Sequence, residues 1–136
     1  TKKAQEYAST GCLEEFIHIY LNAGQWKNTD LSDGLKQAKR CWEGPVLIGV
    51  DEVFRTCGPE ENMDFRVPLS DWERKIGNIA VSLTDPLALP PIILQKTHCG
   101  LYVRDGNHRV EAAKRAGWFH LWAVIWLDTD APESSS

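Results

Sequence analysis

The sequence lacks any run of about eighteen apolar residues, so it predicts no transmembrane helix and no membrane partner. Its first residues, TKKAQEYASTG, have no apolar core of the kind found in secretion signals. No two of the four cysteines form a CxxC pair, and no cysteine–histidine cluster has zinc-finger spacing. Two disulfides in a secreted protein are one interpretation. Scattered cysteines in a chain with a good core more often stay reduced, so we expect a cytoplasmic protein.

The chain also lacks an excess of positive charge. Its net charge is −4 and its pI is about 5.5. Proteins that grip duplex DNA through its phosphates usually have a basic face and a basic pI. A DNA-binding role would therefore rest on a local patch, such as the one around the last predicted helix, which is equally typical of a solvated helix end. The patch comprises Arg104, Arg109, Lys114 and Arg115.

Length and composition predict a single globular domain. Hydrophobic residues make up 43% of the chain and charged residues 25%, as in ordinary globular proteins. A length of 136 residues suits one domain with a core and is short for two. We expect a helical N-terminal extension over residues 1–44, a core over residues 45–130 and a frayed tail over residues 131–136.

The first forty residues are predicted to be helical. One helix should begin near Leu13 and stop at Gly24, and a second should begin near Ser32, weakened by Gly34. Five apolar side chains share one face of the first helix: Leu13, Phe16, Ile17, Tyr20 and Leu21. We expect both helices to cover a core that the rest of the chain supplies.

The middle of the chain mixes strand and loop patterns. Residues 45–50 (PVLIGV) are typical of a buried strand, and residues 55–64 (RTCGPEENMD) of a polar loop. Residues 65–69 predict an edge strand, because Pro68 cannot donate to a ladder. A helix should follow, capped by Ser70 or Asp71. Its inward stripe is predicted to be Trp72, Ile76, Ile79 and Leu83.

The last third has the clearest pattern. Residues 91–95 and 101–105 predict two strands that pair as a hairpin or lie near each other. Residues 107–117 predict a helix with a glycine stop, and residues 119–127 a final strand. Tryptophans 118, 122 and 126 are expected to pack beneath the N-terminal helices. Stacking on nucleic-acid bases is the alternative.

Residues 105–109 (DGNHR) lie between a predicted strand and a predicted helix. Gly106 permits a positive φ and a close approach of the backbone to a ligand. The unpaired first amides of the helix favour phosphate, carboxylate or sulfate. Arg109 adds a guanidinium suited to phosphate oxygens, and His108 a hydrogen-bond donor or general acid. Asp105 is suited to a metal ion, a ribose hydroxyl or the loop backbone.

A purely structural interpretation accounts for the same residues. In it, Asn107 or Asp105 only caps the helix and Arg109 is only a surface charge. Spacing alone does not separate this interpretation from an anion site.

Residues 90–117, PPIILQKTHCGLYVRDGNHRVEAAKRAG, resemble the core of the ParB/sulfiredoxin superfamily. The shared pattern is a PPI strand, a DGxHR or GxxR turn, a helix ending near AG and a further strand. Residues 65–83 look like the segment that precedes this core. The resemblance implies an α/β (α+β) fold, with a small mixed sheet and packed helices, over residues 65–127. The helical N-terminal extension matches no family.

The resemblance implies several activities. Sulfiredoxins carry a catalytic cysteine where this chain has Asn107, so sulfiredoxin chemistry is not expected. In ParB proteins the turn holds the phosphates of CTP. In free-serine kinases of this fold, a similar DGHxR turn holds nucleotide phosphates and an upstream glutamate acts as base. Glu73 is the candidate base here, with Glu52, Glu60 and Glu61 as alternatives.

These considerations predict a nucleotide-binding domain that uses ATP, ADP or CTP with Mg²⁺ and hydrolyses the nucleotide or transfers phosphate to a small acceptor. The predicted nucleotide-binding residues are Arg104, Gly106, Asn107, His108 and Arg109. The predicted catalytic residues are Asp105, His108 and Glu73, and the predicted Mg²⁺ ligands are Asp105 and Glu60. The alternatives are a DNA-binding or nuclease module, which the acidic pI disfavours, and a non-catalytic nucleotide sensor.

Overall fold

The computed structural model describes residues 1–11, 13–22, 27–36, 40–81, 83–85, 87 and 89–128. The predicted helix stop at Gly24 and the predicted tail over residues 131–136 lie outside these ranges. Along the chain the elements are α1 (Lys2–Ser9), α2 (Leu13–Leu21), α3 (Thr29–Leu35), β1 (Arg40–Gly49), β2 (Val53–Phe54), β3 (Cys57–Gly58), β4 (Phe65–Arg66), α4 (Leu69–Ala80), β5 (Ile92–Thr97), β6 (Gly100–Asp105), α5 (Asn107–Arg115) and β7 (His120–Asp128). None of the described helices is long and apolar enough to cross a membrane.

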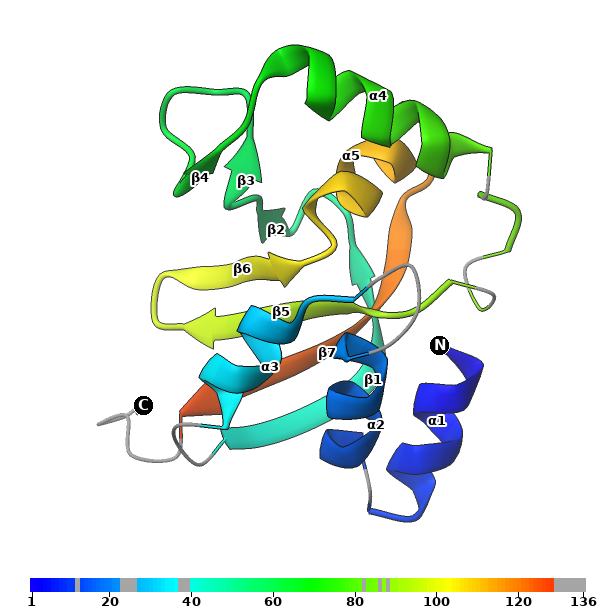
Figure 1. Cartoon of the computed structure of the whole chain (residues 1–136). Coiled ribbons are helices and arrows are strands. Elements are labelled where there is room, and N and C mark those ends of the chain that lie inside the picture. The colour runs from blue at the N-terminus through cyan, green and yellow to red at the C-terminus, as the bar shows by residue number, and fades with distance from the viewer. Residues whose placement is uncertain are drawn as a thin grey trace.

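A five-stranded mixed sheet runs through the centre of the molecule, in the order β1-β7-β5-β6-β2 (Figure 1). β1 pairs antiparallel with β7, β7 parallel with β5, β5 antiparallel with β6, and β6 parallel with β2. The two strands predicted over residues 91–105 are confirmed as β5 and β6, and of the two predicted arrangements they form the hairpin. β3 and β4 form a separate parallel pair.

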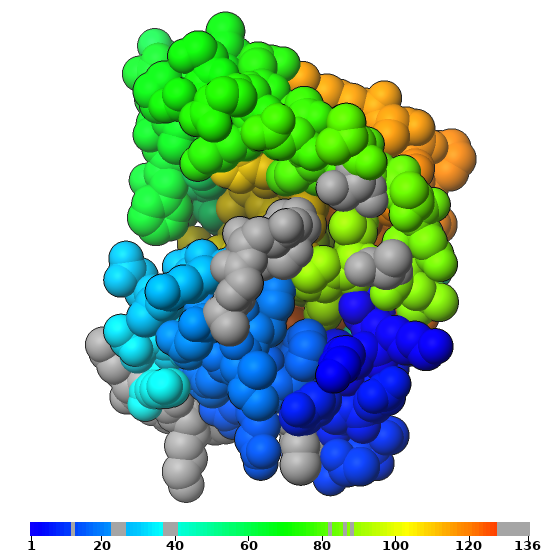
Figure 2. Space-filling model, turned by 45° about the vertical axis from the view of Figure 1, so that its right-hand side comes forward, coloured from blue at the N-terminus to red at the C-terminus, as the bar shows by residue number. Residues whose placement is uncertain are grey.

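Helices cover both faces of the sheet (Figure 1). On one face, α1 and α2 pack with Leu35 of α3 against Ile93, Val124 and Trp126. On the other face, Val110 and Ala113 of α5 join the larger core cluster. α4 packs outside α5 through its predicted stripe, led by Trp72 and Ile76. Figure 2 shows α4 and the N-terminal helices at opposite ends of one face, with α5 between them.

The three tryptophans that were predicted to pack beneath the N-terminal helices do not all lie on the same face of the sheet. Trp126 packs with the N-terminal helices, as predicted. Trp118 packs instead against the α5 side of the sheet, because the chain turns there immediately after α5. Trp122 is half-buried and lies opposite Leu47 of β1.

Strand β1 begins at Arg40, five residues earlier than the apolar run at Pro45 predicted. The pairing with β7 shifts register between Glu43 and Val46, around the Gly44–Pro45 bond. A bulge is a place where a strand tolerates a residue that cannot donate to the ladder. The proline therefore lies within the strand instead of starting it.

Two helix starts also differ from the predictions. α3 begins at Thr29 because the Asn28 side chain accepts a hydrogen bond from the Leu31 amide, an N-cap that the sequence reading overlooked. α4 begins at Leu69 with Pro68 in the N-cap position, so neither Ser70 nor Asp71 serves as the cap.

Candidate functional site

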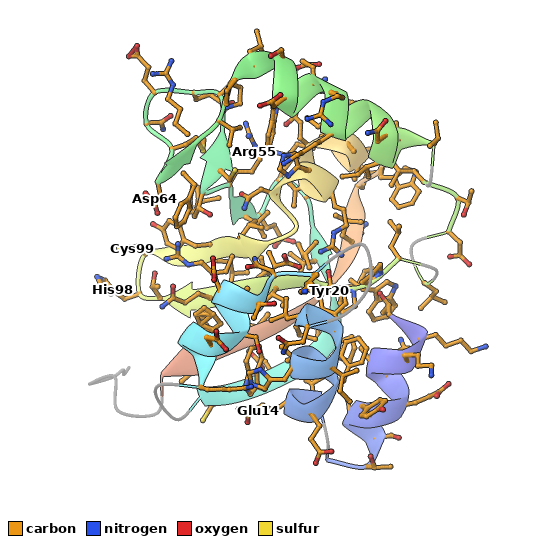
Figure 3. All side chains as sticks on the ribbon, in the orientation of Figure 1. Glu14, Tyr20, Arg55, Asp64, His98 and Cys99 are labelled. Atoms are coloured by element: carbon orange, nitrogen blue, oxygen red, sulfur yellow. The ribbon has the colours of Figure 1, made fainter. Side chains whose placement is uncertain are left out.

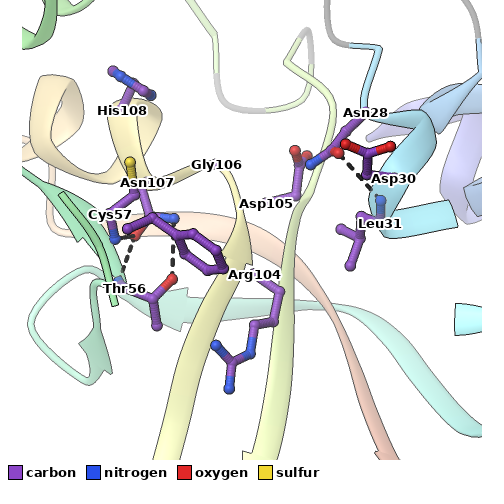
Figure 4. Close-up of a pocket in the computed structure, with 11 residues that line it drawn as sticks. Asn28, Asp30, Leu31, Thr56, Cys57, Arg104, Asp105, Gly106, Asn107 and His108 are labelled. Carbon is purple, nitrogen blue, oxygen red and sulfur yellow. Dashed lines mark hydrogen bonds between the residues drawn. The ribbon is translucent and has the colours of Figure 1, made fainter. Parts of the chain in front are cut away.

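A pocket of about 510 Å³ lies where β6 runs into α5 (Figure 4). Its floor is the predicted anion turn. One wall comes from the start of α3, and the other from the segment containing β3 and β4. The lining residues are Asn28, Asp30, Leu31, Thr56, Cys57, Phe65, Arg104, Asp105, Gly106, Asn107 and His108. Most of the residues that the sequence singled out therefore meet at one cavity.

Gly106 adopts the left-handed conformation that the turn was predicted to require, with a φ of 106°. A Cβ atom at this position would lie 2.5 Å from Cγ2 of Ile92 on β5. This close approach, which requires glycine, is made to the sheet, and the approach of a ligand to the same turn stays a prediction. The same turn opens α5, whose first intrahelical bond runs from the Val110 amide to the Gly106 carbonyl. The preceding amides of the first turn have no partner within the helix.

Asn107 points into the protein and ties the turn to the segment between β2 and β3. Its Oδ1 accepts hydrogen bonds from the amides of Thr56 at 2.7 Å and Cys57 at 3.2 Å (Figure 4). The Thr56 hydroxyl in turn donates to the Val103 carbonyl at 2.5 Å. The Asn107 side chain is buried and committed to these contacts, so only its backbone amide is suited to a phosphate.

Arg109 is also directed inward, and only 2% of its surface is exposed. Its guanidinium lies 2.8 Å from Oδ2 of Asp105, 2.8 Å from the Tyr20 hydroxyl and 2.6 Å from the Pro90 carbonyl. Tyr20 donates to the same Asp105 oxygen at 2.9 Å. Figure 3 shows Tyr20 on α2, so this group joins the N-terminal extension to the end of β6. In this arrangement Arg109 neutralises Asp105.

His108 lies at the rim of the pocket with its ring against Trp72 of α4, 4.5 Å between ring centroids. The guanidinium of Arg55 lies over the Trp72 ring, 4.7 Å from the ring centroid. Burial, followed by the positive charges of Lys75, Arg55 and Arg109, lowers the pKa of His108 from 6.5 to about 4. The imidazole is therefore neutral at pH 7. It is suited to hydrogen bonding and poorly suited to neutralising a phosphate.

The lowered pKa of His108 predicts a loss of stability in acid. The folded protein favours the neutral ring, so this contribution is present above pH 6.5 and is lost as the pH falls towards 4. Because the ring is only half-buried, solvent screening should leave a contribution of about 1 kcal/mol. Between pH 7 and pH 4.5 the free energy of unfolding, measured in urea, should fall by about 1 kcal/mol less in His108→Gln than in the wild type. His98→Gln, on an exposed hairpin tip, is the control and should match the wild type.

The structure places Glu73 and Glu60 outside the pocket lining. Both oxygens of Glu73 accept from Arg115, at 2.6 and 2.8 Å, and this contact lowers the pKa of Glu73. Glu60 pairs with Arg55. Among the described residues, no group of three histidine, cysteine, aspartate or glutamate side chains could hold a metal ion. Of the two predicted Mg²⁺ ligands, only Asp105 reaches the pocket.

Arg104 lines the pocket and is about a quarter exposed. Its Nε donates to Gln95 at 2.9 Å, and its Nη1 lies 3.6 Å from the exposed carboxylate of Asp64. Asp64 is exposed and Gln95 is half-buried, so a ligand phosphate would compete with these two partners for the guanidinium. Among the predicted nucleotide-binding side chains, Arg104 is the cation that faces the cavity.

Sequence reasoning missed the two walls of the pocket. The Asn28 cap was a detectable signal for the start of α3, but the sequence holds no pattern that places α3 beside the turn. Cys57 lies in the predicted polar loop, where burial raises the pKa of its thiol. Its place beside Asn107 depends on a two-residue strand, which is too short to show periodicity.

Comparison with known protein families and with curated proteins finds no match to this chain.

Proposed function

We propose that the protein is a nucleotide-binding domain of the ParB/sulfiredoxin type, which holds the phosphate groups of its ligand at the start of α5. The observation that carries the proposal is the pocket of about 510 Å³ at the start of a nine-residue helix, where Gly106, Asn107 and His108 line the cavity. Arg104 supplies positive charge at the same cavity. The backbone amides following Gly106 donate to phosphate oxygens. Arg109 does not reach the ligand and stabilises the turn through its hydrogen bonds to Asp105 and the Pro90 carbonyl.

The reaction that we propose is hydrolysis or transfer of the terminal phosphate to a small acceptor. Asp105 is the carboxylate of the turn that lines the cavity. Arg109 and Tyr20 hold its Oδ2, and within the described residues Oδ1 accepts no hydrogen bond. This oxygen orients the attacking water or hydroxyl. With Asp105 as its protein ligand, Mg²⁺ would be held mainly by phosphate oxygens, which is common for this ion.

A non-catalytic nucleotide sensor is the second candidate. The ion pair between Glu73 and Arg115 favours it, because this pair holds the predicted base outside the pocket lining. A sensor would bind the same nucleotides and leave them intact.

The binding proposal is tested with Arg104→Gln. Titration calorimetry with ATP, ADP, CTP and GTP, each with Mg²⁺, should show binding of at least one nucleotide. Affinity should fall about tenfold in the variant, since a charge-assisted contact to phosphate is lost. Arg74→Gln removes an exposed cation from α4 outside the pocket lining and should bind like the wild type.

A second measurement locates the ligand. Bound nucleotide should slow alkylation of Cys57, which lines the pocket, and leave the exposed Cys41 and Cys99 unaffected. Phosphorus NMR of the same samples, with and without free serine, separates turnover from binding alone. Absence of binding by all four nucleotides would refute the proposal, and salt-dependent binding of duplex DNA in their place would favour the DNA-binding alternative.

A further inference from the structure

The N-terminal extension forms one wall of the pocket. This wall consists of the N-cap residue of α3 and two residues of its first turn, Asn28, Asp30 and Leu31. The rest of the lining comes from residues 56–108, which overlap the segment that resembles ParB and sulfiredoxin. The extension therefore contributes a surface that the resemblance does not account for.

The two ends of the cavity differ in charge. The α5 end presents the first turn of that helix, and the side chain of Arg104 on β6 also lines the cavity. The α3 end presents the carboxylate of Asp30 (Figure 4). The Asp30 carboxylate disfavours a second anionic group here and favours hydroxyl groups, which donate hydrogen bonds to it.

Asn28 adds the complementary donor. Its Oδ1 accepts from the Leu31 amide at 3.2 Å, which fixes the orientation of the side-chain amide. Within the described residues, Nδ2 donates no hydrogen bond, so it remains available to a ligand. A donor from Asn28 beside an acceptor from Asp30 matches a pair of adjacent hydroxyls, because each hydroxyl both donates and accepts.

We propose that Asn28 and Asp30 bind the ribose hydroxyls of the nucleotide, so that the extension selects ligands whose sugar carries both hydroxyls. This inference rests on the proposed function, because it places the phosphate groups at α5. Leu31 lines the same wall and supplies an apolar contact beside these polar groups. The extension then acts as a specificity element, and it also supplies Tyr20, which holds Asp105.

The test compares Asp30→Asn with the matched variant Asp33→Asn. Both changes remove one negative charge from an exposed position on α3, and of the two residues Asp30 lines the pocket whereas Asp33 does not. The ligands are ATP and CTP, the 2′,3′-dideoxy form of each, and tripolyphosphate. Asp30→Asn should weaken ATP or CTP about five- to tenfold and leave the dideoxy forms and tripolyphosphate unchanged or slightly tighter. Asp33→Asn should leave all the affinities unchanged.

The outcomes separate this inference from the proposal on which it rests. If tripolyphosphate and the nucleotides bind and respond to Arg104→Gln, but Asp30→Asn does not distinguish ribose from dideoxyribose, the ribose assignment alone is wrong. An equal loss for tripolyphosphate would also overturn it, since the effect would then lie at the phosphate end. If none of these compounds binds, the proposed function and the ribose assignment are refuted together.

Discussion

Replacing Arg109 with methionine is expected to destabilise the protein by about 3 kcal/mol, because the largely buried carboxylate of Asp105, 12% exposed, loses its positive partner. The guanidinium is 2% exposed and lies 2.8 Å from both Oδ2 of Asp105 and the Tyr20 hydroxyl. Methionine fills similar volume, so the loss reports mainly on the charge and hydrogen bonds. Urea unfolding at pH 7 measures it, and Arg74→Met, at an exposed position on α4, should change stability by less than about 0.5 kcal/mol.

A double variant separates the charge from the packing. Asp105→Asn in the Arg109→Met background removes the stranded charge, so the double variant should be more stable than Arg109→Met alone. The contrary result is equally informative. If Arg109→Met were as stable as the wild type but bound nucleotide more weakly, Arg109 would be the phosphate ligand that the sequence alone predicted.

The sequence was sufficient to predict β5, β6, α5 and β7, because these elements are long enough for their periodicity to be detected. It was insufficient for β2 and β3, which have two residues each. Strands this short form only because they pair with a neighbour, β2 with β6 and β3 with β4. Their formation is decided by tertiary contacts that no local pattern carries.

The position of the turn was predictable from the sequence. The directions of its side chains were also predictable from helical spacing, but the interpretation of residues 105–109 as an anion site did not use that spacing. Val110 and Ala113 of α5 face the sheet and are fully buried. Asn107 lies three residues before Val110, and Arg109 four before Ala113, so helical spacing places both on the inward side. His108 falls between them and reaches the rim. The sequence interpretation therefore treated Asn107 and Arg109 as ligand-facing side chains, although they lie on the buried side of α5.

The association of α3 with the turn could not be predicted from the sequence. Asn28 and Asp105 line one pocket although they are far apart in the chain. Tyr20 reaches Asp105 across a similar separation. These contacts depend on how the N-terminal helices dock on the sheet through Ile93 and Trp126, and docking of this kind leaves no mark on local sequence.

Gly106→Ala should destabilise the protein by about 3 kcal/mol, from two separate causes. A φ of 106° is costly for a residue with a side chain, at about 1 kcal/mol or more. The new Cβ would also lie 2.5 Å from Cγ2 of Ile92, which is fully buried in the main core cluster and cannot move freely. Thermal or urea unfolding measures the sum of these two costs.

Gly117→Ala is the matched control for the second cause. Its φ is 82°, also left-handed, and no atom would lie within 4 Å of the new Cβ. Gly117→Ala should lose about 1 kcal/mol, so the difference between the two variants reports the close contacts of the new Cβ, of which those with Ile92 are the shortest. Equal losses would show that β5 yields to the new methyl group. If Gly106→Ala then abolished nucleotide binding at this smaller cost in stability, the glycine would serve the approach of a ligand, as the sequence alone suggested, more than the packing of the turn against the sheet.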